Sequence, residues 1–403
     1  MAKATNIEES HNLLSPNKVY IPLASVNSKY YDLFVDEGEE VKVGEKIAER
    51  FGDSKTHIFS TVSGKVEGVV ELEFHSGIVV EHLVIANYKK DIIHVNIKPV
   101  EGELTASNIQ KKINELGIKG LAQRGLYTRF DFSKTVDHVF VNAVYQNEPF
   151  IHVNPELVHH YQNEILEGIK LLSKAAFAPV TILVRSNEDA SVFINEGFNI
   201  VRVNPNNVGV WKYNAIRKIV GKELSKDLLD DRVMFVSTDT ARAVYNAVVK
   251  GMPVVETDVL VSGTALKGNA YFTVRVGTSV KEMIETLGYA EGVEDASIYI
   301  GSILCGRTMQ SDDFSCTEFV NFVGVDIPKK DEPHVCIKCG RCNDVCPVGI
   351  LPQNIMDAEL RMLEERIFDL DVSKCIECGV CSYVCPSEIN VLEWIRRAKR
   401  RIT

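Results

Sequence analysis

The chain has 403 residues, a length typical of about two to four domains, and its 45% hydrophobic and 25% charged residues are those of a globular protein. A net charge of −10 argues against general nucleic-acid binding. No apolar run reaches the roughly 18 residues of a membrane span, and the polar N-terminal residues lack the apolar core of a signal peptide. We therefore expect a cytoplasmic protein that reaches a membrane only through a partner.

Residues 18–90 have the pattern of short strands separated by Gly-containing turns. The spacing of Gly38 and Gly44, followed by Ser-Gly64-Lys-Val, resembles a biotinyl/lipoyl-like barrel-sandwich module. In carrier modules a Lys between two Met stands at the hairpin tip, whereas this tip reads Thr61-Val-Ser-Gly. We expect no prosthetic group here, Lys65 as an ordinary surface residue, and a module used for docking or packing.

Residues 102–250 alternate between apolar strand patterns and helical patterns. The expected strands are 138–143, 180–184, 198–203 and 234–236. The expected helices are 108–116, a helix that begins at Asn154-Pro155 and runs past Leu172, 191–196 and 240–249. This alternation predicts a mostly parallel sheet in a Rossmann-like α/β domain.

From about residue 254 to 324 the order changes to two strands (254–261 and 271–276), a helix (279–287) and returning strands, which suggests a β-grasp domain. The remainder is expected to be helical, with an amphipathic connector at 357–368. The basic segment 394–402 is expected to be a solvated helix end whose cations suit the helix dipole, with contact to anionic lipid or an acidic partner as the alternative.

All ten Cys residues lie after position 300, and eight of them form two runs with the spacing C-x2-C-x2-C-x3-C-P. This spacing is that of a ligand set for two [4Fe–4S] clusters, in which the fourth Cys of each run is a ligand of the other cluster. The predicted ligands of one cluster are Cys336, Cys339, Cys342 and Cys385. The predicted ligands of the second are Cys375, Cys378, Cys381 and Cys346.

Zinc binding and disulfide formation are the alternative uses of these Cys residues. Structural zinc sites need only four thiols each and rarely place four closely spaced Cys before Pro. Disulfides are not expected in a chain without a secretory signal. Cys305 and Cys316 are interpreted as small core residues with a redox role as the alternative, and His334 as a loop residue beside the first run.

The order of these segments resembles the RnfC family, which supplies a subunit of the ion-translocating electron transport complex, over nearly the whole chain. The stretches that carry the resemblance are the Gly38/Gly44 hairpin, 62–66, 141–149, 167–169, 243–253 and the two Cys runs. The resemblance implies a barrel-sandwich module (1–100), a Rossmann-like domain (101–252), a β-grasp, SLBB-like domain (253–328) and a ferredoxin-type dicluster domain (329–403). It also implies electron transfer from NADH through FMN and the clusters to a membrane module.

The sequence departs from the family where the nucleotide pocket is expected. The Gly-rich loop reads Gly120-Leu-Ala-Gln-Arg124-Gly-Leu-Tyr-Thr-Arg129-Phe, and three further pocket stretches differ at 147–149, 203–209 and 301–306. Arg124 and Arg129 are either phosphate contacts or solvated Arg residues, and Glu148 is either a remnant pocket acid or a surface residue. The divergent loop argues against FMN and NADH binding.

Three functions are compatible with these residues. The first is an electron-transfer protein that relays electrons between redox partners, in an Rnf-type membrane complex or with a soluble reductase, without catalytic residues of its own. The second is an NADH-oxidising flavoprotein subunit with a divergent pocket. The third is a structural subunit in which the clusters stiffen the C-terminal domain. The first is our expectation, for a protein in the cytoplasm or peripheral on the cytoplasmic face of a membrane.

Overall fold

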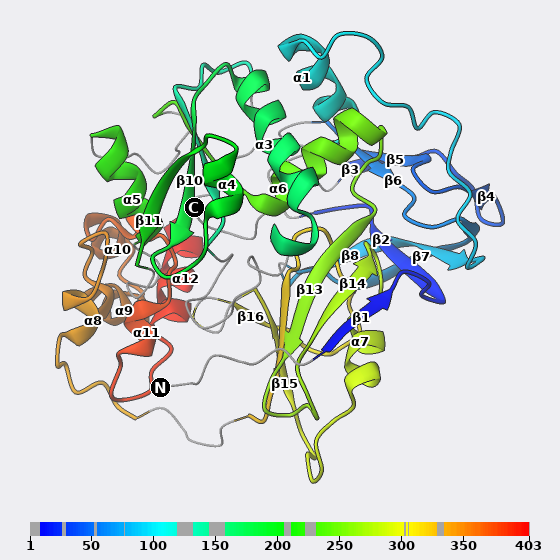
Figure 1. The fold of residues 1–403 in the computed structure, drawn as a ribbon. Helices are drawn as coiled ribbons and strands as arrows, with labels where there is room; N and C mark the ends of the chain where they lie inside the picture. Colours follow the sequence, from blue (N-terminus) through cyan, green and yellow to red (C-terminus); the bar gives the residue numbers. More distant parts are fainter. Residues whose placement is uncertain are drawn as a thin grey trace.

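The computed structural model describes residues 9–25, 30–51, 55–75, 77–118, 132–144, 158–204, 211–221, 231–301, 304, 306–328 and 334–402. Four β-sheets and a C-terminal group of short helices make up this part of the chain. The N-terminal strands (blue) and the C-terminal helices (orange and red) lie on opposite sides of the molecule, with the other sheets between them (Figure 1).

The N-terminal module is built from two antiparallel sheets that share one apolar core. The first has the order β2-β8-β7-β4 and the second β3-β5-β6. Their core includes the fully buried Leu23, Ile47, Val62 and Leu83. The strands are β2 (Lys18–Pro22), β3 (Tyr30–Leu33), β4 (Glu40–Val41), β5 (Lys46–Phe51), β6 (Thr56–Phe59), β7 (Gly64–Glu73) and β8 (Val79–Asn87).

The hairpin tip of this module is buried rather than free. The Thr61 hydroxyl donates a hydrogen bond of 2.7 Å to the carbonyl of Val276, the residue that directly follows a strand of another sheet (β14, Ala270–Arg275). The backbone N–H of Tyr20 donates to the carbonyl of the neighbouring Gly277 at 2.8 Å. Lys65 is exposed, as predicted. The tip therefore serves as a packing surface between two sheets.

The second region is a parallel sheet with helices on both faces. Its strands are β9 (His138–Asn142), β10 (Val180–Arg185), β11 (Asn199–Val203) and β12 (Val233–Ser237), in the order β11-β10-β9-β12. All neighbouring strands are parallel, which confirms the sheet expected from strand–helix alternation. The helices are α1 (Ala106–Glu115), α3 (Gln162–Ala176), α4 (Ser191–Asn195), α5 (Trp211–Val220) and α6 (Thr238–Tyr245).

The helix predicted over 240–249 differs in its second half. It begins at Thr238, and from Asn246 to Lys250 it continues as the π-helix η1. Gly251 ends it with a φ of +71°, and a side chain at that position would collide with the backbone of Lys98. The missing side chain at Gly251 lets the chain pass close to Lys98. Hydrophobic periodicity does not reveal the π-helical turn before it.

The third region is a six-stranded mixed sheet in the order β1-β14-β13-β17-β15-β16, packed against α7 (Val280–Leu287). The strands are β1 (Glu9–Leu13), β13 (Glu256–Ser262), β14 (Ala270–Arg275), β15 (Ser297–Ile300), β16 (Arg307–Thr308) and β17 (Phe322–Asp326). β1 runs parallel to β14, from the pair Glu9/Ala270 to the pair Leu13/Val274. This edge strand was not predicted, because its sequence Glu-Ser-His-Asn-Leu is mostly polar.

The C-terminal region consists of short helices around a small core that contains Ile355, Ile367 and Ile395. The connector 357–368 is not one helix, because the chain turns at Met362, where φ is +56°. The helices are α8 (Arg341–Asp344), α9 (Pro352–Leu360), α10 (Glu364–Asp369), η2 (Val372–Lys374), α11 (Val380–Tyr383) and α12 (Val391–Ile402).

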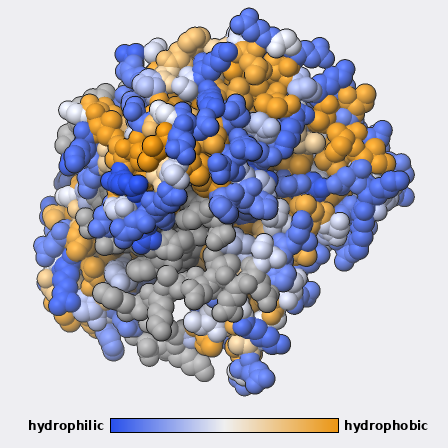
Figure 2. All heavy atoms as spheres, in the orientation of Figure 1, coloured by the Kyte–Doolittle hydropathy of each residue, from blue (hydrophilic) through white to orange (hydrophobic). Residues whose placement is uncertain are grey.

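Figure 2 shows hydrophobic side chains in separate groups on the visible face, with hydrophilic side chains between them. In the part of the chain that the structure describes, no helix has both the length and the apolar character needed to cross a membrane.

Candidate metal centre

The two Cys runs share one backbone conformation. Lys338 and Glu377 occupy the third position of each run, and both have a φ of +55°. Gly340 and Gly379 follow with φ of +78° and +77°, and each stands at the N-cap of a one-turn helix, α8 or α11. A left-handed conformation at the cap favours Gly. The sequence repeat is therefore also a repeat of local structure.

Four thiols from both runs line one cavity. Cys336, Cys339 and Cys342 come from the first run and Cys385 from the second. The chain after Cys385 is fixed to the start of the first run, because the Ser387 hydroxyl donates to the carbonyl of Val335 at 3.1 Å. The Ser387 carbonyl in turn accepts from the N–H of His334 at 3.0 Å. The structure thus brings together the four residues predicted as one ligand set.

The second predicted set lies deeper in the same region. Cys375 and Cys381 are each 8% exposed. Burial raises the pKa of Cys375, and the nearby Cys346 adds to this rise. Burial also raises the pKa of Cys381 to about 12, and the thiols of Cys378 and Cys375 add to this rise. Cys346 of the first run is therefore a neighbour of the second set.

The donor chemistry fits iron–sulfur clusters. Thiols with raised pKa values ionise only when a metal supplies positive charge, so loading must release protons. Each predicted set supplies four thiols, which is the ligand number of a [4Fe–4S] cluster.

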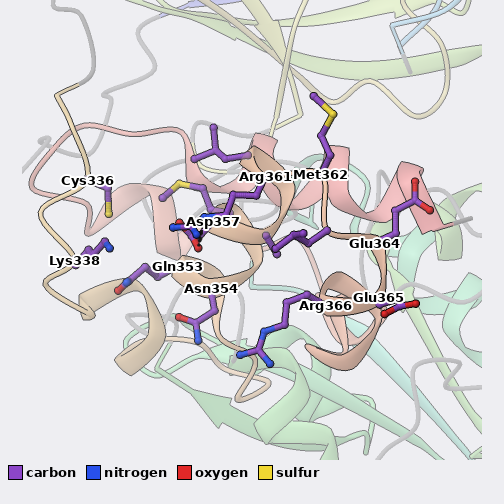
Figure 3. Close-up of a pocket in the computed structure, with 14 residues that line it drawn as sticks. Cys336, Lys338, Gln353, Asn354, Asp357, Arg361, Met362, Glu364, Glu365 and Arg366 are labelled. Atoms are coloured by element: carbon purple, nitrogen blue, oxygen red, sulfur yellow. Dashed lines mark ion pairs between the residues drawn. The ribbon is translucent and has the colours of Figure 1, made fainter.

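A groove of about 680 Å³ runs beside the first run. It lies along α9 and the start of α10, with Cys336 at one end and Glu364 and Glu365 at the other (Figure 3). Val335 and Ile337, on either side of Cys336, are 87% and 67% exposed. The first run therefore faces the surface, whereas Cys375 and Cys381 of the second run are buried.

Two side chains of α12 contact the second run. Glu377 accepts hydrogen bonds from Arg396 Nε at 3.0 Å and from Lys399 Nζ at 2.9 Å. Burial acts to raise the pKa of Glu377, but Lys399 and Arg396 outweigh it and hold that pKa at about 2. Glu377 is therefore a carboxylate at neutral pH, enclosed by two cations.

Sequence reasoning missed this group, since it placed 394–402 at a solvated helix end. That expectation is wrong for Arg396, which is 9% exposed, and for Lys399, whose side chain is 20% exposed. Arg401 is exposed, as expected, although it pairs with the buried Glu359. The sequence does contain a pattern that points to this contact. Arg396 and Lys399 are three residues apart, so they lie on one face of a helix, and the second Cys run contains the acidic residue Glu377.

The other residues singled out in the sequence lie outside the two predicted ligand sets. Cys316 is fully buried in the core of the six-stranded sheet, and burial raises its pKa far above the usual range, in agreement with a core residue. His334 is an exposed loop residue, as predicted. The Gly-rich stretch with Arg124 and Arg129, as well as Glu148 and Cys305, lies outside the described residues.

The fold and the paired Cys runs define an iron–sulfur protein of the two-cluster class: residues 328–386 match the family model of the 4Fe-4S dicluster domain. Residues 1–90 match the RnfC barrel sandwich hybrid domain. The chain is thus similar to RnfC proteins at its N-terminal end, and it has relatives along most of its length.

One relative is the C subunit of the ion-translocating oxidoreductase complex of Methanosarcina acetivorans, with 25% identity over 84% of this chain and 82% of the relative. The C subunit of the Na⁺-translocating ferredoxin:NAD⁺ oxidoreductase complex of Acetobacterium woodii is 26% identical over 87% of this chain and 83% of the relative. The chain spans only 51% of the length of the corresponding protein from Serratia proteamaculans. Among solved structures, an NAD⁺-reducing [NiFe]-hydrogenase matches 76% of this chain and 66% of its own, with 11% identity and a TM-score of 0.48.

Proposed function

We propose that the chain holds two [4Fe–4S] clusters with exchanged fourth ligands. Cys336, Cys339, Cys342 and Cys385 hold one, and Cys375, Cys378, Cys381 and Cys346 hold the other. The single observation that carries this proposal is the cavity lined by three thiols of one run and the last thiol of the other. Such clusters, when bound, accept and release single electrons. The protein's part is to supply thiolates and to bury two of them, Cys375 and Cys381, in the second set.

The proposed domain division follows the separate apolar cores. These are the barrel-sandwich core (1–100), the core on both faces of the parallel sheet (101–252), the core beneath α7 (253–328) and the core of the C-terminal helices (329–403). The parallel sheet supports a Rossmann-like domain, and the six-stranded sheet with α7 supports a β-grasp, SLBB-like domain. β1 is contributed to the β-grasp sheet by the first segment.

The proposed role is that of an electron-relay subunit of an Rnf-type redox complex, peripheral on the cytoplasmic face of a membrane. Its support is the relationship to RnfC-type proteins over 84% and 87% of this chain. The bulky residues at 123–124, where the family has Gly, favour a relay without FMN or NADH. An NADH-oxidising flavoprotein subunit is the second candidate, and the same relatives favour it. A scaffold role is the third.

An anaerobic titration with NADH separates these roles. The relay predicts that the purified protein contains no stoichiometric FMN and that NADH does not bleach the iron–sulfur absorbance, while dithionite does. One FMN per chain with rapid bleaching by NADH would establish the flavoprotein instead. For the scaffold, the double variant Cys339→Ala/Cys378→Ala would leave the turnover of an assembled complex intact.

A further inference from the structure

The two Cys runs carry opposite charges at the same position. Lys338 and Glu377 share the left-handed φ of +55° and the same place between the first and second Cys of their runs. Lys338 is exposed, and no ion pair or hydrogen bond holds its side chain among the described residues. Glu377 is held by cations of α12. The pseudo-symmetry of the domain is therefore broken electrostatically.

The cations of α12 contact the second run directly. Lys399 Nζ donates to the carbonyl of Cys375 at 2.7 Å and to Glu377 Oε1 at 2.9 Å. Arg396 Nε donates to Glu377 Oε2 at 3.0 Å. The side chains of Arg396 and Lys399 are 10% and 20% exposed. Two cations and one carboxylate together carry one net positive charge beside the buried Cys375.

A buried charge acts more strongly than an exposed one. Solvent and salt screen the charge of Lys338, whereas the charges of Arg396 and Lys399 lie in a medium of lower dielectric constant. Reduction adds one electron and hence one negative charge to a cluster, so its potential depends on nearby charge, on hydrogen bonds to sulfur and on burial. Burial disfavours the added charge. The net positive charge of the α12 group opposes this effect.

We propose that Arg396, Lys399 and Glu377 are positioning residues that set the reduction potential of the cluster held by Cys375, Cys378, Cys381 and Cys346, and leave that of the other cluster nearly unchanged. The inference rests on the proposed two-cluster function. The N–H of Glu377 also donates to Cys375 Sγ at 3.3 Å, so the residue that holds the two cations also contacts a ligand sulfur. Arg396 further donates to the carbonyl of Gly306 at 3.3 Å, which fixes this group against the rest of the protein.

The test is a redox titration of the anaerobic full-length protein, followed by electron paramagnetic resonance. Lys399→Met removes a positive charge and is expected to shift one of the two midpoint potentials to a more negative value. Glu377→Gln removes the negative charge and is expected to shift the same midpoint to a more positive value. Lys338→Met is the matched control from the exposed run, and it leaves that midpoint unchanged.

If Lys399→Met and Glu377→Gln shift the same midpoint potential in opposite directions, the effect comes from charge and not from a purely structural role. Equal shifts of both midpoints, shifts of the same sign, or no shift would overturn the inference. If Lys399→Met fails to retain iron, Arg396→Gln tests the same charge with the same expected sign. A wild-type protein without iron would refute the two-cluster proposal itself, whereas an iron-loaded protein with unchanged potentials would refute only the role of α12.

Discussion

Gly168 of α3 lies directly against the backbone carbonyl of Ala241 in α6. A Cβ atom at residue 168 would stand 1.9 Å from that oxygen, so no side chain fits while the two helices keep their distance. The segment 167–169 is one of the stretches that resemble the RnfC family, and this contact gives it a physical reason. The close approach of α3 and α6 forms part of the core on one face of the parallel sheet.

Gly168→Ala is accordingly expected to destabilise the α/β region by about 1–3 kcal/mol, because the added methyl group forces the helices apart. Denaturant unfolding followed by circular dichroism measures the change. Gly268→Ala is the matched control, since a Cβ there meets no atom within 4 Å. Equal stability of the two variants would contradict the close packing of α3 and α6.

The hydroxyl of Thr61 links the barrel-sandwich tip to the segment that directly follows β14. Thr61→Val keeps the shape of the side chain but leaves the buried carbonyl of Val276 without this donor, at a cost of about 1–3 kcal/mol. We expect a lower unfolding midpoint and faster hydrogen exchange at residues 276–278. Thr286→Val, which removes an exposed hydroxyl on α7, serves as the control and should change stability by no more than about 0.5 kcal/mol.

Asp239, in the first turn of α6, is expected to make the stability of the protein depend on pH. Burial, with a contribution from Asp258, raises its pKa to about 7. Its Oδ1 is buried and has no hydrogen-bond partner among the described residues. A raised carboxyl pKa means that the folded state holds a proton that the unfolded state releases, so stability is present at low pH and is lost as pH rises through about 7.

Between pH 6 and 8 this single group is expected to reduce stability by about 1.4 kcal/mol. Asp239→Asn removes the dependence, so its thermal midpoint should exceed that of the wild type by more at pH 8 than at pH 6. A constant difference between the two proteins across this range would show that the carboxyl group does not titrate there.

The ligand exchange between the runs can be tested by single substitutions. Cys339→Ser and Cys385→Ser stand in different runs but line the same cavity, so both are expected to abolish the same electron paramagnetic resonance signal. Cys346→Ser is expected to abolish the other signal. Cys316→Ala, in the core of the six-stranded sheet, is expected to leave both signals in place. If Cys339→Ser and Cys346→Ser abolished the same signal and Cys385→Ser abolished the other one, the exchange would be contradicted.

Much of the fold follows from local patterns in the sequence. Strand–helix alternation predicts the parallel sheet β9 to β12, and the repeated Cys spacing predicts which thiols share a cavity. The Cys spacing is informative because three ligands of one cluster must come from a few neighbouring residues of the chain.

Features that depend on distant partners were not predicted. β1 is polar and is defined by its pairing with β14, about 260 residues away. In the sequence, Arg396 and Lys399 look like part of a solvated, charged helix end. Only the fold shows that both form ion pairs with Glu377. The turn at Met362 depends on a left-handed residue that periodicity does not mark.

Metal and sulfide analysis of the anaerobically purified full-length protein shows whether its eight Cys residues hold two iron–sulfur clusters. We expect roughly eight iron atoms and eight acid-labile sulfides per chain. Two zinc ions per chain without sulfide, in a colourless protein, would contradict it.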